Sequence, residues 1–469
     1  MKKFTRSKIR IVTAASLFDG HDAAINIMRR IMQAQGAEVI HLGHNRSARE
    51  IVEAAIQEDA QAIAVTSYQG GHMEFFKYMY DLLQENQCGH IKIFGGGGGT
   101  ILPNEIEELH QYGIARIYSP DDGRRMGLEG MIADVLSKAS PGDDFAESIL
   151  EGIQYIKPKP EYWKSISLAI TMAEEGFFNL IEKYLPPTAN NTPVLGITGT
   201  GGAGKSSVTD EIVRRFLYHF REKSVAVLSV DPSRKKTGGA LLGDRIRMNA
   251  VFNPRAYMRS MATRESNKSL SPQIQQAINI CKAAGYDLVI LESAGVGQSD
   301  ASILDFCDVS LYVMTPEYGA ATQLEKINML DYADLVAINK FDKSGALDAY
   351  QDVCKQYKRN HGLFNAKNED LPIVGTIASK FNNEGVNRLF ELLVKKIKEK
   401  KKMNWGELLP SPKGTDLSAP IIPSDRIRYL AEIAETIEQY NKWATEQSEI
   451  ASRLYQLDGA IKLLKNIDE

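Results

Sequence analysis

The chain has 469 residues; 43% are hydrophobic and 25% are charged, and 56 basic against 59 acidic residues leave a net charge of −3. This composition is typical of a soluble protein with two to four domains, and it carries no basic field that would indicate a nucleic-acid partner. The four cysteines form no Cys-x-x-Cys pair, and no apolar run approaches the roughly 20 residues of a membrane span. We expect a cytoplasmic protein with neither a disulfide framework nor a membrane segment.

Residues 1–140 alternate short apolar runs with amphipathic segments. This alternation predicts a flavodoxin-like α/β domain, in which helices cover a parallel sheet. Ligands of such sheets bind beyond the carboxyl ends of the strands. Asp19, His21, Ser67 and the glycines 95–99 all follow an expected strand. The strand candidates are residues 9–15, 37–43, 62–68, 91–96 and 115–119.

An aspartate and a histidine stand two residues apart in SLFDGHDAA (16–24), directly after the first of these runs. Such a pair is most often part of a surface loop. The alternative is a metal site, in which His21 binds the metal through one ring nitrogen and Asp19 fixes the other. The residues alone leave both interpretations open.

Residues 141–190 read as a helical connector, because SPGDD is a linker signal and YIKPKPEYW interrupts a mostly helical segment. A second alternating region then occupies residues 191–409. Its strand candidates are residues 193–200, 225–231, 286–293, 309–316, 334–342 and 372–379.

The sequence GTGGAGKS (199–206) matches the P-loop pattern, follows a predicted strand and opens a predicted helix. Its backbone N–H groups would hold phosphate oxygens, Lys205 would reach the β- and γ-phosphates, and the Ser206 hydroxyl would bind magnesium. The region is therefore predicted to be a P-loop nucleotide-binding domain. The triphosphate residues are Gly201, Gly202, Ala203, Gly204, Lys205, Ser206 and Ser207.

The base is indicated by NKFD (339–342), which ends a predicted strand. The Asp342 carboxylate can accept protons from N1 and the exocyclic amine of guanine, and adenine offers no matching pair of donors. Asn339 and Lys340 complete this motif, and Ser379 and Lys380 of the later ASK segment fit the guanine-contact pattern of GTPases. We therefore predict GTP as the nucleotide.

Three acidic residues at predicted strand ends and loops are candidate magnesium ligands beside Ser206: Asp231, Asp244 and Glu292. Glu292 and Lys205 are the candidate catalytic residues. Ras-like enzymes have Asp-x-x-Gly where this chain has Glu292, and they have a glutamine that is missing here. The group that orients the attacking water therefore stays open.

Five segments resemble the GTPase chaperones of cobalamin-dependent acyl-CoA mutases, the family of the methylmalonic aciduria type A protein. The resemblance covers residues 193–400. It implies a GTPase that gates cofactor loading into a mutase and often pairs as a homodimer, and it adds Arg247 to the GTP site and Ser293 to the magnesium site. The segments are VDPS, TGGALLGDRIRM, MRSMATRESN, ESAGVGQSD and EYGAATQLEKI.

This resemblance changes the interpretation of His21. The cobalamin domains of these mutases carry D-x-H-x-x-G, S-x-L and G-G motifs, and this chain departs from them at Ala24 and Gln69. Both departures resemble the fused isobutyryl-CoA mutases. The resemblance implies adenosylcobalamin, with His21 as the lower ligand of cobalt and Asp19 behind it. Ser67, Gly95, Gly96 and Gly97 would then receive the dimethylbenzimidazole tail, and His72 could face the corrin or simply begin a helix.

Residues 410–469 are predicted to be a linker and a polar helix, and they resemble the segment that precedes the acyl-CoA barrel in fused isobutyryl-CoA mutases. The chain has no room for that barrel. We therefore expect it to isomerise isobutyryl-CoA to n-butyryl-CoA only with a barrel from another chain or a missing C-terminal part. The alternatives are a separate GTPase chaperone for methylmalonyl-CoA mutase or a related mutase, and a cobalamin-sensing module. An adenosyltransferase is a further candidate partner, and residues 232–247, 257–269 and 293–300 are candidate nucleotide-sensing loops.

Overall fold

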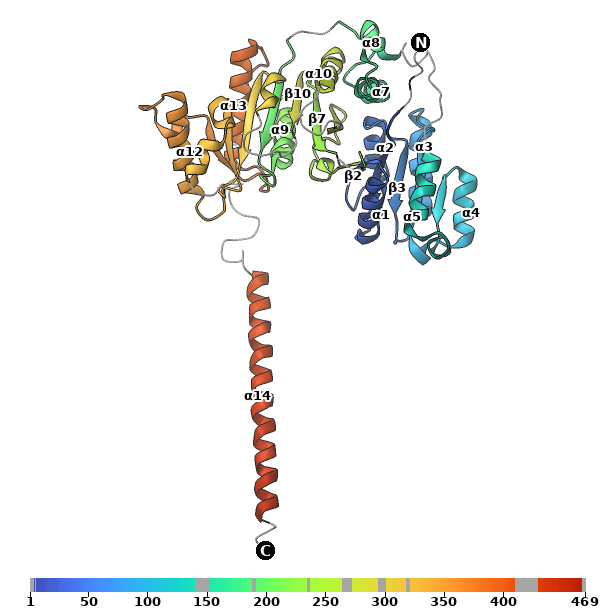
Figure 1. Ribbon diagram of the computed structural model, residues 1–469, viewed down its shortest axis with the longest axis vertical. Helices are drawn as coiled ribbons and strands as arrows, with labels where there is room; N and C mark the ends of the chain where they lie inside the picture. The colour runs from blue at the N-terminus through green and yellow to red at the C-terminus, as the bar shows by residue number, and fades with distance from the viewer. Residues whose placement is uncertain are drawn as a thin grey trace. The chain divides into compact units, whose positions relative to one another are not determined.

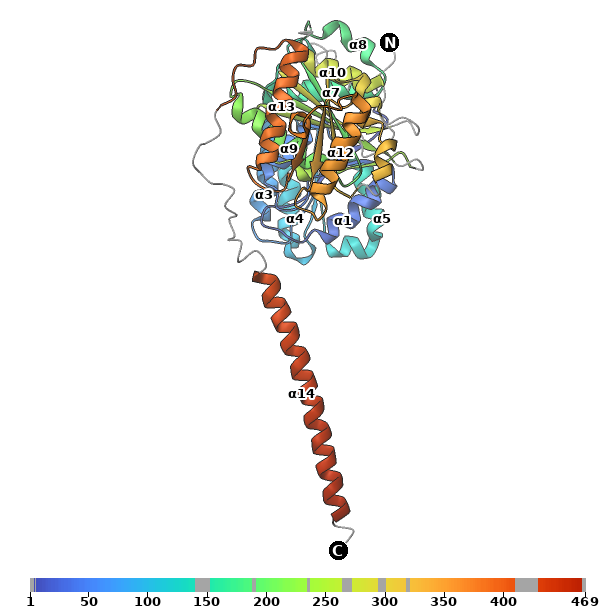
Figure 2. The ribbon, with the colours of Figure 1, turned by 90° about the vertical axis from the view of Figure 1, so that its left-hand side faces the viewer.

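The computed structural model describes residues 4, 6–139, 152–187, 191–233, 237–263, 272–293, 301–317, 321–409 and 429–465. The chain divides into two compact units, Met1–Leu409 and Pro410–Glu469. The first unit contains two parallel sheets covered by helices, which confirms the predicted α/β class (Figures 1 and 2). The expected linker at 410–425 and the loop residues 264–269 and 294–300 lie outside the described residues.

The N-terminal sheet has the strand order β5-β4-β3-β1-β2, the flavodoxin-like order, and β2 pairs with one further strand, β8. Helices α1 and α5 contact each other, and α3 contacts both α2 and α4. The strands are β1 (Arg10–Ala15), β2 (Glu38–His41), β3 (Ala62–Thr66), β4 (Lys92–Gly96) and β5 (Arg116–Tyr118). The helices are α1 (Ala23–Ala34), α2 (Ala48–Gln57), α3 (His72–Glu85), α4 (Pro103–Tyr112) and α5 (Pro120–Ala139).

The sixth strand of this sheet comes from a distant part of the chain. Strand β8 (Ala240–Leu242) pairs in parallel with β2, with Glu38 opposite Ala240 and Ile40 opposite Leu242. Residues 232–247 were expected to form a loop beside the nucleotide. In the described part of that segment, residues 240–242 instead extend the N-terminal sheet, because the β2 edge offers them backbone hydrogen-bonding partners.

The second sheet has the order β13-β12-β11-β6-β10-β7-β9, and every pairing in it is parallel. The predicted P-loop joins β6 to α9. The strands are β6 (Val194–Gly199), β7 (Val225–Pro232), β9 (Ala256–Thr263), β10 (Leu288–Glu292), β11 (Val309–Met314), β12 (Leu335–Asn339) and β13 (Ile373–Thr376). The main helices are α9 (Lys205–His219), α10 (Pro272–Ala283), α12 (Ala346–His361) and α13 (Glu384–Lys401).

Strand β9 was missed from sequence, and the expected loop at 257–269 is wrong for residues 257–263. The segment AYMRSMAT contains an arginine and a serine, which argue against a buried strand. Both are nevertheless buried, because Arg259 pairs with Glu174 at 2.5 Å and the Ser260 hydroxyl donates to Glu58 at 2.9 Å. Polar partners from other parts of the chain therefore allow this strand to lie inside the protein.

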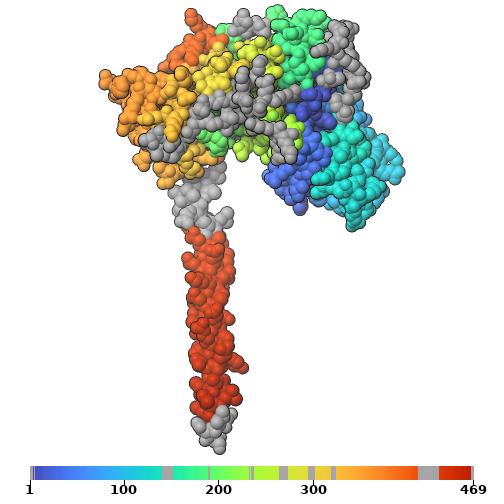
Figure 3. Space-filling view, viewed as in Figure 1, coloured from blue at the N-terminus to red at the C-terminus, as the bar shows by residue number. Residues whose placement is uncertain are grey.

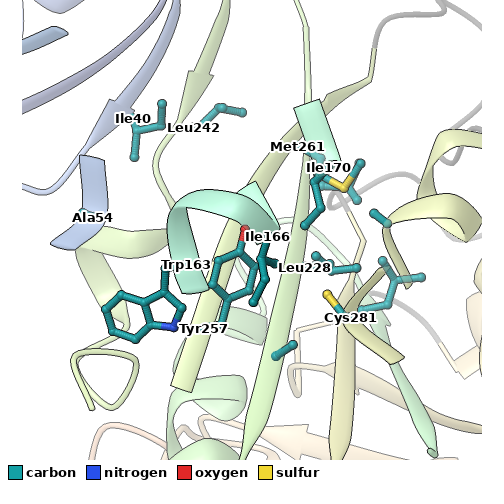
Figure 4. Packing of buried hydrophobic residues seen from close by; sticks show 14 of the residues in the cluster. Ile40, Ala54, Trp163, Ile166, Ile170, Leu228, Leu242, Tyr257, Met261 and Cys281 are labelled. Atoms are coloured by element: carbon teal, nitrogen blue, oxygen red, sulfur yellow. The ribbon is translucent and has the colours of Figure 1, made fainter. Parts of the chain in front are cut away.

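The connector helix α7 (Trp163–Glu174) is buried on nearly all sides, as expected of a helix inside a protein rather than on its surface. It contacts both α2 of the N-terminal domain and α10 of the second domain. Trp163 and Ile166 of α7 share one hydrophobic cluster with Ile40 of β2 and Leu228 of β7 (Figure 4). The two sheets are thus joined by a continuous apolar core.

Buried His41, the last residue of β2, predicts a pH-dependent stability. Burial, reinforced by the charge of Arg29, lowers the pKa of His41 to about 4, and its Nδ1 lies 3.0 Å from the Thr13 hydroxyl. As the pH falls below about 6.5, His41 becomes protonated in the unfolded chain but stays neutral in the folded protein until the pH approaches 4. Lowering the pH from 7.5 to 5 should therefore cost about 2 kcal/mol of folding free energy through this residue.

Urea unfolding of wild type and His41→Gln at the two pH values measures this effect. The pH-dependent loss should be smaller by that amount in His41→Gln, whereas replacing exposed His44 with glutamine should leave it as in wild type. An equal pH-dependent loss in wild type and His41→Gln would contradict the prediction.

The second unit contains the long helix α14 (Tyr429–Lys465). Its apolar side chains are exposed, including Ile437, Trp443 and Leu454, and Figure 3 shows the side chains of this helix in red. Among the described residues, no helix combines the length and the apolar character that a membrane crossing requires.

Candidate functional site

The first candidate site lies after β1, where Asp19 and His21 face each other. His21 Nδ1 lies 2.9 Å from Asp19 Oδ1, and the His21 side chain is 77% exposed while that of Asp19 is fully buried. Because a carboxylate only accepts hydrogen bonds, Nδ1 must carry a proton, and Nε2 is the ring nitrogen that is left for another partner. A metal ligand of the histidine type is arranged in this way, with one ring nitrogen held by a carboxylate and the other available to the metal.

Asp19 is held in place by the backbone around it. Its Oδ2 accepts a 2.6 Å hydrogen bond from the Tyr68 N–H after β3, and Oδ1 accepts another from the His21 N–H. Burial disfavours the ionised carboxylate, but these N–H groups and His21 outweigh it and lower the pKa of Asp19. The donor set therefore fits a metal ion such as cobalt, which the resemblance implies that His21 would bind.

An apolar cavity of about 190 Å³ lies beside these residues, at the carboxyl ends of β3 and β4. Tyr68, whose backbone holds Asp19, lines it together with Met28 and Met131 from the helices and Phe94 from the sheet. The lining offers few polar groups, so the cavity suits a flat apolar ring system such as a benzimidazole.

The expected glycines have two different roles. Gly96 lines the cavity on the same sheet face as Phe94, and a side chain there would meet only the Tyr118 carbonyl, at 3.5 Å. At Gly95 a Cβ would collide with Phe76 at 2.4 Å, and at Gly97 it would lie 2.0 Å from the Ser67 carbonyl oxygen. Gly96 therefore leaves room in the cavity, whereas Gly95 and Gly97 allow close packing around it.

Two other expected residues have internal partners. The Ser67 hydroxyl is buried and accepts a 3.0 Å hydrogen bond from Ser16. His72 is the first residue of α3, and its Nε2 lies 3.0 Å from the Glu105 carboxylate. His72 was expected either to face the corrin or to begin a helix. This contact favours the second interpretation, in which His72 begins α3 and pairs with an acidic residue.

The second candidate site is the P-loop between β6 and α9. Gly199 and Gly204 have positive φ angles of 154° and 87°, and Cβ atoms there would lie 1.9 Å from the Val313 carbonyl oxygen and 2.5 Å from Asn339. Only glycine fits at these two positions of the loop, whose N–H groups lead into the N-terminus of α9. Lys205 Nζ donates to the carbonyls of Gly199 and Thr200 at 3.2 and 3.3 Å. Burial lowers the pKa of Lys205.

Hydroxyls and carboxylates from four parts of the chain meet at the start of α9. The Ser206 hydroxyl lies 2.8 Å from Glu292 at the end of β10 and 3.2 Å from Asp244. Thr209 donates to the second oxygen of Glu292 at 2.8 Å, and Ser229 donates to Asp244. Three of the expected magnesium ligands, Ser206, Asp244 and Glu292, are thus brought together.

The charges at this cluster favour a cation. Burial, reinforced by Asp244, raises the pKa of Glu292 to about 8 and that of Asp231 to about 7. These carboxylates repel one another, and oxygen ligands of this kind suit Mg²⁺. Among the described residues, no three His, Cys, Asp or Glu side chains form a metal site by themselves, so the Ser206 hydroxyl and nucleotide phosphates would have to complete it.

The remaining expected residues lie around the P-loop. Arg247, Ser207, Ser379 and Lys380 line a polar cavity of about 240 Å³. Asn339 donates to the Ala203 carbonyl at 2.8 Å, Lys340 donates to the Gly202 carbonyl at 2.8 Å, and Asp342 is exposed. The Ser293 hydroxyl instead donates to Thr198 at 2.8 Å.

Sequence reasoning missed three residues at these sites. Thr209 and Ser229 hold the carboxylates of the acidic cluster, and they could have been found from spacing: Thr209 lies one helical turn after Lys205, and Ser229 shares a strand face with Asp231. Phe18, next to Asp19, has φ 64° and is 82% exposed, and no pattern in the sequence indicates this.

The fold and both sites define a B12-binding α/β domain joined to a P-loop GTPase. Residues 168–406 match the family model described as methylmalonyl Co-A mutase-associated GTPase MeaB, and residues 9–122 match the B12 binding domain. The chain belongs to the MeaB family of methylmalonyl-CoA mutase-associated GTPases, and it carries a B12-binding domain in front of the GTPase.

The relatives confirm the predicted resemblance to fused isobutyryl-CoA mutases. The chain is 55% identical to the fused isobutyryl-CoA mutase of Geobacillus kaustophilus over 98% of its own length and 43% of the relative's. It is 52% identical to that of Cupriavidus metallidurans over 98% of this chain and 42% of the relative. The matching protein of Nocardia farcinica is 48% identical over 96% and 42%, respectively. The chain therefore spans less than half the length of these relatives.

Proposed function

We propose that this chain is the adenosylcobalamin-binding and GTP-hydrolysing part of an acyl-CoA mutase that interconverts isobutyryl-CoA and n-butyryl-CoA in the cytoplasm. The observation that carries the proposal is the outward-facing Nε2 of His21, whose ring is fixed by buried Asp19. Cobalamin would supply radical carbon-skeleton chemistry. The chain's own residues would hold its cobalt through His21 and its tail in the cavity beside Gly96.

The GTPase has the role of a gate in this proposal. Ser206, Asp244 and Glu292 would hold Mg²⁺, Lys205 would bind the β- and γ-phosphates, and Asp342 would select guanine. A nucleotide can change cofactor loading only if it binds one arrangement of the protein better than another. We therefore expect GTP and GDP to give different rates of cofactor transfer. A homodimer through the GTPase domain and an adenosyltransferase as cofactor donor belong to the same proposal.

The substrate barrel would come from another chain or from a longer form of this one. The exposed apolar residues of α14, such as Trp443 and Leu454, favour a partner surface for this helix. The test mixes this chain with the C-terminal part of the Geobacillus relative that it does not match, adds adenosylcobalamin and GTP, and measures n-butyryl-CoA formed from isobutyryl-CoA. The intact Geobacillus protein is the positive control.

We expect isomerisation with wild type and none with His21→Ala. A specific observation favours a second candidate function, since the matching family model is named for methylmalonyl-CoA mutase. If the chain transfers adenosylcobalamin to that mutase and does not support the barrel, it is a separate chaperone. If it supports neither enzyme, the proposed function is wrong.

A further inference from the structure

A buried ion-pair network connects the B12-binding domain to the GTPase. Its centre is Glu58, which follows α2 and has no exposed surface. Glu58 Oε1 accepts a 2.6 Å hydrogen bond from Arg245 Nε, and Oε2 accepts one of 2.6 Å from Arg10. The N–H and hydroxyl of Ser260 also donate to Glu58. A single carboxylate thus joins α2, β1, β9 and the segment after β8.

The network is balanced in charge. Arg10 also pairs with buried Glu38 at 2.6 Å, so two arginines face two glutamates. Burial alone would raise the pKa of Glu58, but Arg245, Arg10 and Arg259 outweigh this effect and lower it. Glu58 is therefore ionised, and replacing it with a neutral residue would leave Arg245 buried without its counter-charge.

The guanidinium of Arg245 is held at a second nitrogen as well. Its Nη2 donates to Gln57 Oε1 at 2.9 Å and to the Met258 carbonyl at 2.5 Å, and the residue has no exposed surface. Arg245 belongs to the short turn η4 (Asp244–Arg247) and directly follows Asp244. The side chain that fixes this turn and the carboxylate that contacts Ser206 are therefore neighbours in the chain.

The B12-binding domain holds η4 on its other sides as well. Strand β8, which ends two residues before Asp244, pairs with β2. Arg46, between β2 and α2, donates to the Ile246 carbonyl at 3.2 Å and to Asn249 at 3.3 Å. Residues on both sides of Asp244 therefore rest on the B12-binding domain.

We propose that Glu58, a residue of the B12-binding domain, is a positioning residue for the GTPase: through Arg245 it holds Asp244 where Asp244 and Ser206 bind Mg²⁺ together. This inference rests on the magnesium site of the proposed function. It makes the B12-binding domain a structural part of the nucleotide site, within one chain. The two domains are then coupled through the contact between Glu58 and Arg245.

The experiment measures the Mg²⁺ dependence of GDP binding in the full chain. A fluorescent GDP is titrated at increasing Mg²⁺ concentrations with wild type, Glu58→Gln and Glu174→Gln. Glu174 is the matched control, because it forms a similarly buried pair with Arg259, and both residues of this pair lie outside η4. We expect Glu58→Gln to raise the half-saturating Mg²⁺ concentration about 10-fold or more, as losses of metal-orienting contacts do. Glu174→Gln should leave it within about twofold of wild type.

Three further variants keep the inference testable. Gln57→Met removes one hydrogen-bond acceptor of Arg245 without changing any charge. It should shift the Mg²⁺ dependence in the same direction as Glu58→Gln. It therefore serves as the test if Glu58→Gln does not fold. Asp244→Asn should shift it at least as far as Glu58→Gln. The double variant, Asp244→Asn with Glu58→Gln, should then resemble Asp244→Asn alone, because Glu58 acts through Asp244.

If Asp244→Asn shifts the Mg²⁺ dependence and neither Glu58→Gln nor Gln57→Met does, the inference about Glu58 is wrong and the magnesium site stands. An equal shift in Glu174→Gln also overturns it, because the effect is then a general loss of stability. If Asp244→Asn has no effect, the proposed magnesium site fails, and the inference fails with it.

Discussion

Replacing His21 with alanine is expected to abolish the binding of cobalamin in its base-off, histidine-bound form. The His21 ring is 77% exposed and its Nδ1 is engaged by Asp19, so Nε2 is the nitrogen that would bind the metal. Alanine removes this ligand without disturbing a core, and the fold should survive. The absorption spectrum of adenosylcobalamin mixed with the variant measures the loss.

Two companion variants make this prediction specific. Asp19→Asn keeps the size of the side chain but not its charge, and it should weaken cobalamin binding by about 10–100-fold, because the ring loses its orienting carboxylate. His90→Ala changes an exposed histidine just before β4, at the amino ends of the strands and away from His21. This variant should bind cobalamin as wild type does. A wild-type spectrum and affinity in His21→Ala would show that cobalt has another ligand.

Replacing Lys205 with alanine should lower GTP hydrolysis by at least about 10²-fold while cobalamin binding persists. Lys205 Nζ donates to two P-loop carbonyls. When GTP binds, its β- and γ-phosphates would accept these hydrogen bonds instead. The lysine charge would then stabilise the negative charge that develops on the phosphates during hydrolysis. The apolar cavity proposed for the cobalamin tail shares no lining residue with the P-loop. Phosphate release and the cobalamin spectrum are measured on the same sample.

The control is Lys223→Ala, which removes a lysine paired with Asp287 at the amino ends of β7 and β10, away from the P-loop. It should hydrolyse GTP at the wild-type rate. Unchanged hydrolysis in Lys205→Ala would mean that the P-loop lysine has no part in the reaction. Loss of both activities would mean that the substitution disturbs the whole unit.

Local patterns were sufficient for much of this structure. The alternation of apolar runs predicts most strands, because parallel strands buried on both faces read as short apolar segments. The P-loop and the NKFD motif indicate their sites because each depends on residues adjacent in sequence. His21 needed a resemblance to a family, since an aspartate and a histidine two apart occur in many loops.

Contacts between distant residues were not predictable in this way. Strand β9 carries Arg259 and Ser260, whose burial is possible only because Glu174 and Glu58 lie opposite. The pairing of β8 with β2 joins residues 202 positions apart, and three residues are too short a run to indicate a strand. Glu58 and Arg245 look like ordinary surface charges in sequence, and only the fold reveals that they meet.

The position of β8 also bears on how the protein forms during synthesis. The N-terminal sheet has its five other strands by residue 118, but β2 remains an open edge until residues 240–242 have left the ribosome. An unpaired edge strand is a common starting point for aggregation. A nascent chain that ends before residue 240 would therefore carry this edge uncovered, and a fragment ending near residue 140 would carry it permanently. Ribosome pausing between residues 140 and 240 should favour misassembly. The translation rate over these roughly one hundred codons therefore bears on the yield of correctly folded protein.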